Sequence, residues 1–418
     1  MPDQLAANGR DASQDMIFQR LHGRIRDTDS HEMYPASVWV REFGPVVAPL
    51  VKVFQEGQSK KVPNSFSVDV DEDARAVSPD SIGDSWGAGC FAVGAFDMEK
   101  RLEVMDVMGV RDCLLFGSVM AIYGHQMAAV GGDLLTNQYE EAGDDETMPS
   151  AMEFGQAVLK AHNDWCIRTA AISPRLRPVA TVLTDDLDAA LAETKRMIDN
   201  GVRAIAIPAG SPIGGKSPAH PDNDALWKLL SDTRTAALFH VGGDIAFRRE
   251  TTAWTDAPLF ASNNTVPTEI PIDPYSMATS NLAVQNYLTS LVLGAVFERF
   301  PDLRCGIMEY SAGWLGPLAE SLDGWVDQFK TRFTSALTMK PSEYIRRNVR
   351  VAPFDFEPVD RYLETYPFMA DVICSATDYP HFEGGKDPIA NMFDKVQRFG
   401  PEVVEKVLVT NAEWIMPD

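Results

Sequence analysis

Four segments that lie far apart in the chain share one pattern, in which a run predicted to be a buried strand ends in a histidine or an acidic residue. The runs end at His31, His240, Glu309 and Asp378, and Asp29 precedes the first of these by two positions. An unpaired charge at the edge of an apolar core is costly, so buried strands rarely end in such groups by chance. The pattern predicts that the four strand ends meet at one point, where their side chains form a metal site.

Strands alternate with amphipathic helical segments along most of the sequence. The predicted strands cover residues 25–31, 110–117, 177–182, 202–208, 236–240, 303–309, 347–352 and 371–378. Between the third and fourth strands, Thr184, Asp185 and Asp186 are candidate helix N-caps and Gly201 ends the helix, which completes one βαβ unit. Eight strands in this alternation predict an α/β fold in which a parallel sheet closes into a (β/α)8 TIM barrel.

One barrel with insertions accounts for the 418 residues. We expect residues 1–20, which lack periodicity, to form a flexible N-terminal arm, and residues 21–418 to form a single domain. Long inserted segments follow strands 1, 2 and 5, at about 55–100, 118–160 and 241–285. They lie on the side where barrel enzymes build their sites, so they predict a partly covered pocket. Either this pocket or local cores under the insertions would contain Trp86, Phe91, Met120, Tyr123, Trp165 and Trp254.

Composition and charge exclude several classes of protein. The 60 acidic and 37 basic residues give a net charge of −23, which argues against nucleic-acid and anionic-membrane partners and leaves a small-molecule substrate. No apolar run approaches the roughly 20 residues of a membrane span, and the N-terminal segment is too polar for a signal peptide. The five cysteines are scattered without a C-x-x-C spacing, which predicts buried free thiols and a cytoplasmic protein.

The candidate ligands define the chemistry of the predicted metal site. Two imidazoles and two or three carboxylates suit Zn²⁺, Mn²⁺ or Fe²⁺ and leave a position for water, whose pKa a divalent ion lowers toward ~7. Taken singly, Asp29 is as well explained by an N-cap or an ion pair, and His31 or His240 by a hydrogen-bonded core histidine. Asp27 is a candidate supporting partner. His381 is left open between metal, substrate and loop contacts, while His22, His125, His162 and His220 are taken as surface or packing residues.

Several segments between residues 24 and 415 carry a family resemblance. They are 27–31 with Pro35 and Trp39, 163–165 before 175–178, 239–243, 296–303, 309–314 and 377–381. With these segments the chain resembles the amidohydrolase-related (amidohydrolase 2) family of the metal-dependent hydrolase superfamily. That branch includes aromatic-acid and aminocarboxymuconate semialdehyde decarboxylases. The resemblance implies that Asp29, His31 and His240 are metal ligands, that Asp378 is both ligand and proton carrier, and that the protein is a homodimer.

Two positions depart from the commonest pattern of that family, which has histidine where this chain has Asp29 and Glu309. The change at Glu309 removes the histidine that the decarboxylases use as an acid and base, which counts against decarboxylation. The fourth strand also ends without the lysine that often bridges two metals, although Glu309 or Glu32 could help to hold a second ion.

Three reactions and one binding function compete on this site. We expect first a metal-dependent hydrolase of an apolar or cyclic carbonyl compound, in which zinc-bound water is activated by Asp378 while Glu309 orients substrate or moves the proton. His381 is a further catalytic candidate. The alternatives are a non-oxidative decarboxylase of a carboxylated aromatic, and a non-haem di-iron monooxygenase, because carboxylate ligands favour iron. Manganese is the other metal alternative. A barrel that only binds ligand is the fourth reading.

Overall fold

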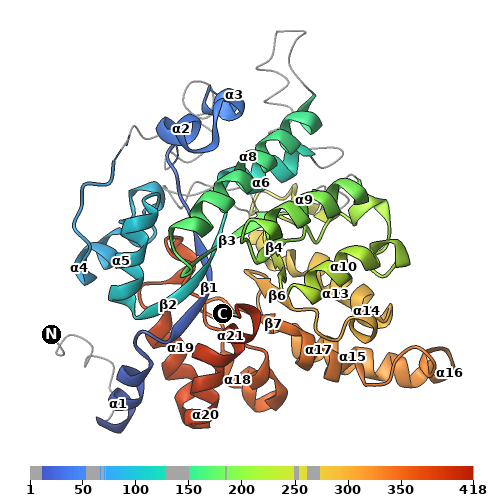
Figure 1. Cartoon of the computed structure of the whole chain (residues 1–418). Coiled ribbons are helices and arrows are strands. Elements are labelled where there is room, and N and C mark those ends of the chain that lie inside the picture. Colours follow the sequence, from blue (N-terminus) through green and yellow to red (C-terminus); the bar gives the residue numbers. More distant parts are fainter. Residues whose placement is uncertain are drawn as a thin grey trace.

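The computed structural model describes residues 12–52, 66, 70, 72–128, 150–183, 186–248, 254–260 and 274–417. Its centre is one parallel sheet of seven strands whose order in space equals their order in the chain. Figure 1 shows these strands surrounded by helices. The strands are β1 (Ile25–His31), β2 (Val110–Phe116), β3 (Leu176–Thr181), β4 (Ala204–Ala206), β5 (Ala236–His240), β6 (Cys305–Met308) and β7 (Val349–Val351).

The eighth predicted strand joins the two edges of this sheet without forming a regular strand. Ile373 makes a parallel bridge to Val351 of β7, and Tyr379 makes one to Ser30 of β1. The backbone N–H of His31 also donates to the carbonyl of Tyr379 at 2.8 Å. The segment at 371–378 therefore lies between β7 and β1 as expected, but its pairing is confined to isolated bridges. The curled sheet is consistent with a TIM barrel.

Helices follow nearly every strand and cover the outside of the sheet (Figure 1). Those of the first half are α1 (Ala12–Leu21), α2 (Trp39–Phe43), α3 (Ala48–Lys52), α4 (Pro79–Ser85), α5 (Met98–Met108), α6 (Val119–Ala128), α8 (Ala151–Ile172), α9 (Leu187–Asp199) and α10 (Asp224–Asp232). Those of the second half are α11 (Ile245–Arg248), α12 (Pro274–Thr279), α13 (Asn281–Leu293), α14 (Val296–Arg299), α15 (Leu315–Gln328), α16 (Lys330–Phe333), α17 (Pro341–Asn348), α18 (Val359–Thr365), α19 (Pro388–Val396), α20 (Pro401–Glu405) and α21 (Asn411–Ile415).

Local sequence signals explain the βαβ unit and fail at the N-terminus. The Asp186 carboxylate accepts from the N–H of Ala189 at 2.8 Å and caps α9, as predicted; Thr184 and Asp185 lie outside the described residues. Residues 12–21, expected to belong to a flexible arm, instead form α1. Its Phe18 ring lies 5.0 Å from that of Phe393, so an apolar contact with α19 fixes a helix that has little periodicity of its own.

The interior of the sheet is filled by small and medium apolar side chains, and its lower end is closed by the C-terminal helix. The buried cluster there joins strand residues to α21: Leu114, Phe116, Val179, Ala204, Ala236, Leu238, Met308, Ala352, Cys374, Ala412, Ile415 and Met416. A Cβ at Gly306 would lie 2.4 Å from Ile415 and 2.5 Å from Leu238. A side chain at this position would therefore require the ends of these neighbouring side chains to move. Side chains thus fill the end of the sheet that α21 covers, and the open space inside the sheet lies at the carboxyl ends of the strands.

The three predicted insertions are described in part. Their described portions contain α4, α6 and the start of α8, α11 and α12. Residues 53–65, 129–149, 249–253 and 261–273 lie outside the described residues, and the insertions stay a prediction. All five cysteines are buried free thiols, as expected. Within the described part of the chain, no helix has the length and apolarity that a membrane crossing needs.

Candidate metal centre

Side chains from three strand ends form the centre of the site. Asp29 and His31 come from β1, His240 ends β5, and Glu309 directly follows β6. One ligand atom from each of these four residues lies within 4.8 Å of the others. His240 Nε2 is 3.0 Å from Glu309 Oε2 and 3.5 Å from Asp29 Oδ1. The structure therefore brings together four of the five predicted metal ligands, which come from three separate segments of the chain.

A second group shares His31 with the first. Its members are Asp378 and His381, which follow the closing segment beside β1. Asp378 Oδ1 is 3.4 Å from His31 Nε2 and 3.3 Å from His381 Nδ1. The rings of His31 and His381 stack with centroids 4.0 Å apart. His381, which the sequence left open, thus belongs to the site.

Asp27 links the segment that carries Asp29 to the segment that carries Asp378. Its carboxylate accepts from the Thr377 hydroxyl at 2.5 Å, the Thr377 N–H at 2.8 Å and the Asp29 N–H at 3.2 Å. The Asp378 N–H in turn donates to the Asp29 carbonyl at 2.7 Å. Asp27 therefore fixes the backbone on both sides of the cluster, which fits the supporting position predicted for it. Burial raises the pKa of Asp27 to about 7.

Buried Arg101 fixes the same strand end from outside. Its guanidinium donates to the carbonyl of His31 at 2.7 Å and to the carbonyl of Gly94 at 2.9 Å. Glu32, considered for a second ion, accepts from the backbone N–H groups of Ser118 at 2.9 Å and Tyr34 at 3.2 Å. Its carboxylate is thus committed to positioning the chain after β1 and β2, and burial raises its pKa to about 8.

Two of the site residues have unusual backbone conformations. Glu309 has φ 56° and Asp378 has φ 54°, in the left-handed region that non-glycine residues rarely occupy. Such a residue costs roughly 1–3 kcal/mol and persists where the surroundings hold it. The loop after Glu309 is anchored by Glu357, which accepts from the N–H of Ala312 at 2.9 Å. The chain turns sharply at both positions, and each turn leaves a carboxylate at the cluster.

The histidines differ in charge because their surroundings differ. Burial, with the other histidines adding to it, lowers the pKa of His31 well below its usual range, so this ring is neutral. Burial acts the same way on His240, but the carboxylates of Asp29 and Glu309 outweigh it and raise the pKa of His240 well above its usual range. Burial and the neighbouring carboxylates also raise the pKa of Asp378. Both shifts favour the protonated forms, which offset the crowded negative charge of the carboxylates.

Several buried polar atoms at this point lack a hydrogen-bond partner among the described residues. They include Asp29 Oδ1, both ring nitrogens of His31 and both carboxylate oxygens of Asp378. Buried polar atoms are almost always paired, and a concentration of unpaired ones calls for an explanation such as an ion. On β5, His240 Nδ1 lies 2.9 Å from the carbonyl of Val241, which leaves Nε2 directed at the cluster. The donor set fits a divalent cation.

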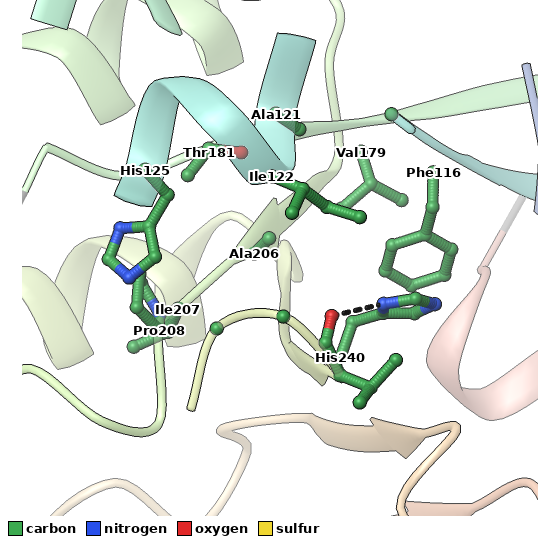
Figure 2. A pocket seen from close by; sticks show the side chains of 14 residues that line it. Phe116, Ala121, Ile122, His125, Val179, Thr181, Ala206, Ile207, Pro208 and His240 are labelled. Carbon is green, nitrogen blue, oxygen red and sulfur yellow. Dashed lines mark hydrogen bonds between the residues drawn. The ribbon is translucent and has the colours of Figure 1, made fainter. Parts of the chain in front are cut away.

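An apolar pocket opens beside the cluster (Figure 2). Its cavity volume is about 50 Å³, and it reaches from His240 to His125 on α6. Between them its wall includes Phe116, Ile122 and Val179. The Phe116 ring lies 4.4 Å from the His240 ring, centroid to centroid. A smaller space of about 10 Å³ is lined by Asp29, Glu309 and Asp378.

The sequence missed the residues of this pocket. Phe116 was read only as part of a strand, and His125 as a surface or packing residue. None of the six side chains predicted from the insertions lines the pocket beside the cluster: Trp86, Phe91, Met120, Tyr123, Trp165 and Trp254. Trp86, for example, packs against Tyr379 and donates to the carbonyl of His381 at 3.0 Å, so it supports the loop that carries Asp378. Ile122 and His125 are three positions apart on helix α6 (Val119–Ala128). Because residues at this spacing lie on one face of a helix, the sequence could have predicted that both face the same side.

Comparison with known proteins identifies the family. A family model described as Amidohydrolase matches residues 140–415. The chain belongs to this amidohydrolase family. The resemblance drawn from the sequence is thus confirmed, and the matched region includes His240, Glu309 and Asp378. A search of curated proteins found no significant match.

Solved structures similar to this amidohydrolase share its fold. An amidohydrolase from Mycobacterium avium subsp. paratuberculosis K-10 has a TM-score of 0.64 at 18% identity, with 94% of this chain and 98% of that chain covered. The 5-carboxyvanillate decarboxylase LigW from Sphingomonas paucimobilis has 0.54 at 20%, with 94% and 98% covered. The 5-carboxyvanillate decarboxylase from Novosphingobium aromaticivorans DSM 12444, complexed with manganese and 4-hydroxy-3-methoxy-5-nitrobenzoic acid, has 0.56 at 16%, with 94% and 96% covered.

Proposed function

We propose that the protein is a metal-dependent lyase that removes CO₂ from a carboxylated aromatic compound without an oxidant. The observation that carries the proposal is the convergence of Asp29, His31, His240 and Glu309 next to an apolar pocket. A cation site that borders an apolar cavity suits a substrate with one anionic group and one flat hydrophobic body. The structural similarity to two 5-carboxyvanillate decarboxylases supports this choice of substrate class.

The metal would be held by the group of four residues, with Asp378 within reach of the same point. Two imidazoles with carboxylates suit Mn²⁺ or Zn²⁺, and a similar structure was solved with manganese. When bound, a divalent ion would hold the substrate carboxylate and offset its negative charge. Glu309, at 3.0 Å from His240 Nε2, would complete the donor set where the commonest family pattern has histidine.

Asp378 is the residue placed to move the proton. Decarboxylation requires a proton to add to the ring carbon that bears the carboxylate. The bond from that carbon to the carboxylate then breaks, its electron pair restores the aromatic ring, and CO₂ leaves. The Asp378 carboxyl group would supply this proton, and His381, whose Nδ1 lies 3.3 Å from Asp378 Oδ1, would return one from solvent. This pair takes over the acid and base role that the absence of a histidine at Glu309 had placed in question.

This order of functions differs from the one expected from the sequence, which put hydrolysis first. The family model is named for hydrolases, and the same cluster could activate water for attack on a carbonyl. Two of the three similar structures described above are decarboxylases, and the pocket is apolar, so we place decarboxylation ahead of hydrolysis. Nothing in the comparisons supports a di-iron monooxygenase, which stays a prediction from the ligand set alone.

The proposal is tested by measuring CO₂ release from hydroxylated and methoxylated benzoates and benzene dicarboxylates, with protein loaded with Mn²⁺ or Zn²⁺. We expect release that needs the metal and continues without oxygen, together with incorporation of one solvent deuterium into the product ring. Asp378→Asn should abolish release while metal stays bound. Asp164→Asn, which changes an exposed carboxylate paired with Arg196, is the matched control and should retain activity. Cleavage of esters or lactones by the loaded protein without any CO₂ release would instead establish hydrolysis.

A further inference from the structure

Two polar side chains, His125 and Thr181, line the pocket away from the cluster. Figure 2 shows His125 and His240 at opposite ends of the pocket, with Thr181 and several apolar side chains between them. His125 is 3% exposed, and its Nε2 has no hydrogen-bond partner among the described residues. Leaving such an atom buried and unpaired is unfavourable, and the remedy is a partner that enters the pocket.

Packing alone does not explain His125, as a second buried histidine makes clear. His162 on α8 is also fully buried, but it stacks between Phe43 and Trp165 and contacts Cys166 Sγ through Nδ1 at 3.7 Å. Among the described residues His125 makes no such contacts, and it lines a cavity instead. Burial lowers the pKa of both rings to about 4, so both are neutral near pH 7. A neutral imidazole nitrogen can either donate or accept, which matches a hydroxyl group.

The walls between the two histidines determine what else the ligand contains. Phe116, Ile122, Val179, Ala206 and Ile207 are apolar and come from β2, α6, β3, β4 and the segment after β4. The Phe116 and His240 rings are inclined by 31°, so the cluster end of the pocket is bounded by two ring faces. A flat aromatic body fits such walls, and its two polar groups would have to lie at its opposite ends.

We propose that His125 is the residue that selects the substrate, by hydrogen bonding a hydroxyl group on the ring at the end remote from the carboxylate. This inference rests on the proposed function, because the carboxylate is taken to lie at the Asp29–His31–His240–Glu309 cluster. The substrate class is thereby narrowed to aromatic acids with a hydroxyl group meta or para to the carboxylate. An ortho hydroxyl would lie at the cluster end, beside the carboxylate, out of reach of His125.

The test is a set of calorimetric binding titrations of manganese-loaded protein with benzoate and its 2-, 3- and 4-hydroxy derivatives. For the wild type we expect the 3- or the 4-hydroxy compound to bind about 10-fold more tightly than benzoate, the size of one good hydrogen bond. His125→Leu should remove this preference and leave benzoate affinity within about twofold, because leucine restores the apolar wall. His125→Gln, which can still donate and accept, should keep part of it.

Two controls separate recognition from structural damage. His162→Gln replaces an equally buried histidine that does not line the pocket, so the preference should survive. The affinity for 2-hydroxybenzoate, which would bind through the metal, should be the same in wild type and His125→Leu. Equal affinities would show that the metal-loaded cluster is intact in the variant.

The inference is overturned if the wild type binds neither the 3- nor the 4-hydroxy compound more tightly than benzoate, or if His125→Leu retains the preference. Absence of binding by all four compounds overturns it as well. If the preference depends on His125 but no aromatic acid releases CO₂, the recognition stands and the proposed reaction fails.

Discussion

Replacing Gly117 by alanine tests the packing behind the pocket wall. Gly117 follows β2 and lines the pocket, and its φ lies outside the left-handed region, so its conformation alone does not require glycine. A Cβ there would lie 2.2 Å from His162 Nε2, 2.7 Å from His162 Cε1 and 2.8 Å from Ala121 Cβ. All three contacts are shorter than real Cβ atoms tolerate, so a neighbour must move.

The loss in the free energy of unfolding caused by Gly117→Ala depends on how far His162 can move. The ring is 0% exposed and lies between the rings of Phe43, at 6.3 Å, and Trp165, at 5.4 Å. Overpacking of a filled core costs typically 1–3 kcal/mol, and a wedged ring puts Gly117→Ala at the upper end, about 3 kcal/mol. Urea denaturation followed by tryptophan fluorescence measures the loss in the free energy of unfolding. In a His162→Ala background two of the three contacts disappear, so the cost of Gly117→Ala should fall by about 2 kcal/mol.

The matched control is Gly324→Ala in the middle of α15, where an added Cβ meets nothing within 4 Å. Alanine has the higher helix propensity, so this variant should gain up to about 1 kcal/mol. If Gly117→Ala is as stable as Gly324→Ala, or if His162→Ala leaves its cost unchanged, the described contact between β2 and α8 is wrong.

Two further predictions concern other supports of the site. The pKa of His162 is about 4 in the folded chain and about 6.5 when unfolded, so its stabilising effect is present above pH 6.5 and falls as pH decreases toward 4. The free energy of unfolding of His162→Gln should therefore move closer to that of the wild type by about 2 kcal/mol between pH 7 and pH 5, measured by urea denaturation. If the difference between the two proteins is the same at both pH values, the ring of His162 is accessible to solvent. Asp27→Ala leaves the N–H and hydroxyl of Thr377 and the N–H of Asp29 without their acceptor, and should lower manganese affinity by about 10- to 100-fold in calorimetric titration. Asp27→Asn, which retains an acceptor oxygen, is its control, and equal affinities of the two variants would contradict a positioning role.

The sequence predicts which residues meet at the cluster because a buried strand that ends in a charged group is informative by itself. Asp29, His31 and His240 follow from this rule, since parallel strands in a barrel have their carboxyl ends at one mouth. Glu309 and Asp378 follow from it too, although each reaches the cluster through a left-handed backbone turn that nothing in the local sequence announces.

Features that depend on packing between distant segments were not predictable. The segment before Asp378 reads as a strand but makes only isolated bridges, and its Thr377 donates from both N–H and hydroxyl to the Asp27 carboxylate. Helix α1 has few local signals and depends on the contact between Phe18 and Phe393. His125 is one histidine on a largely apolar helix, and its role emerges only when α6 is placed over the mouth of the pocket.

The measurement that tests the metal centre most directly is an anomalous difference map at the manganese edge, from a crystal grown with Mn²⁺. A strong peak within bonding distance of Asp29, His31 and His240, with Glu309 or Asp378 beside it, is the expected result. A map without a peak between these side chains, or with its strongest peak elsewhere on the protein, would contradict the assignment of a metal to the cluster.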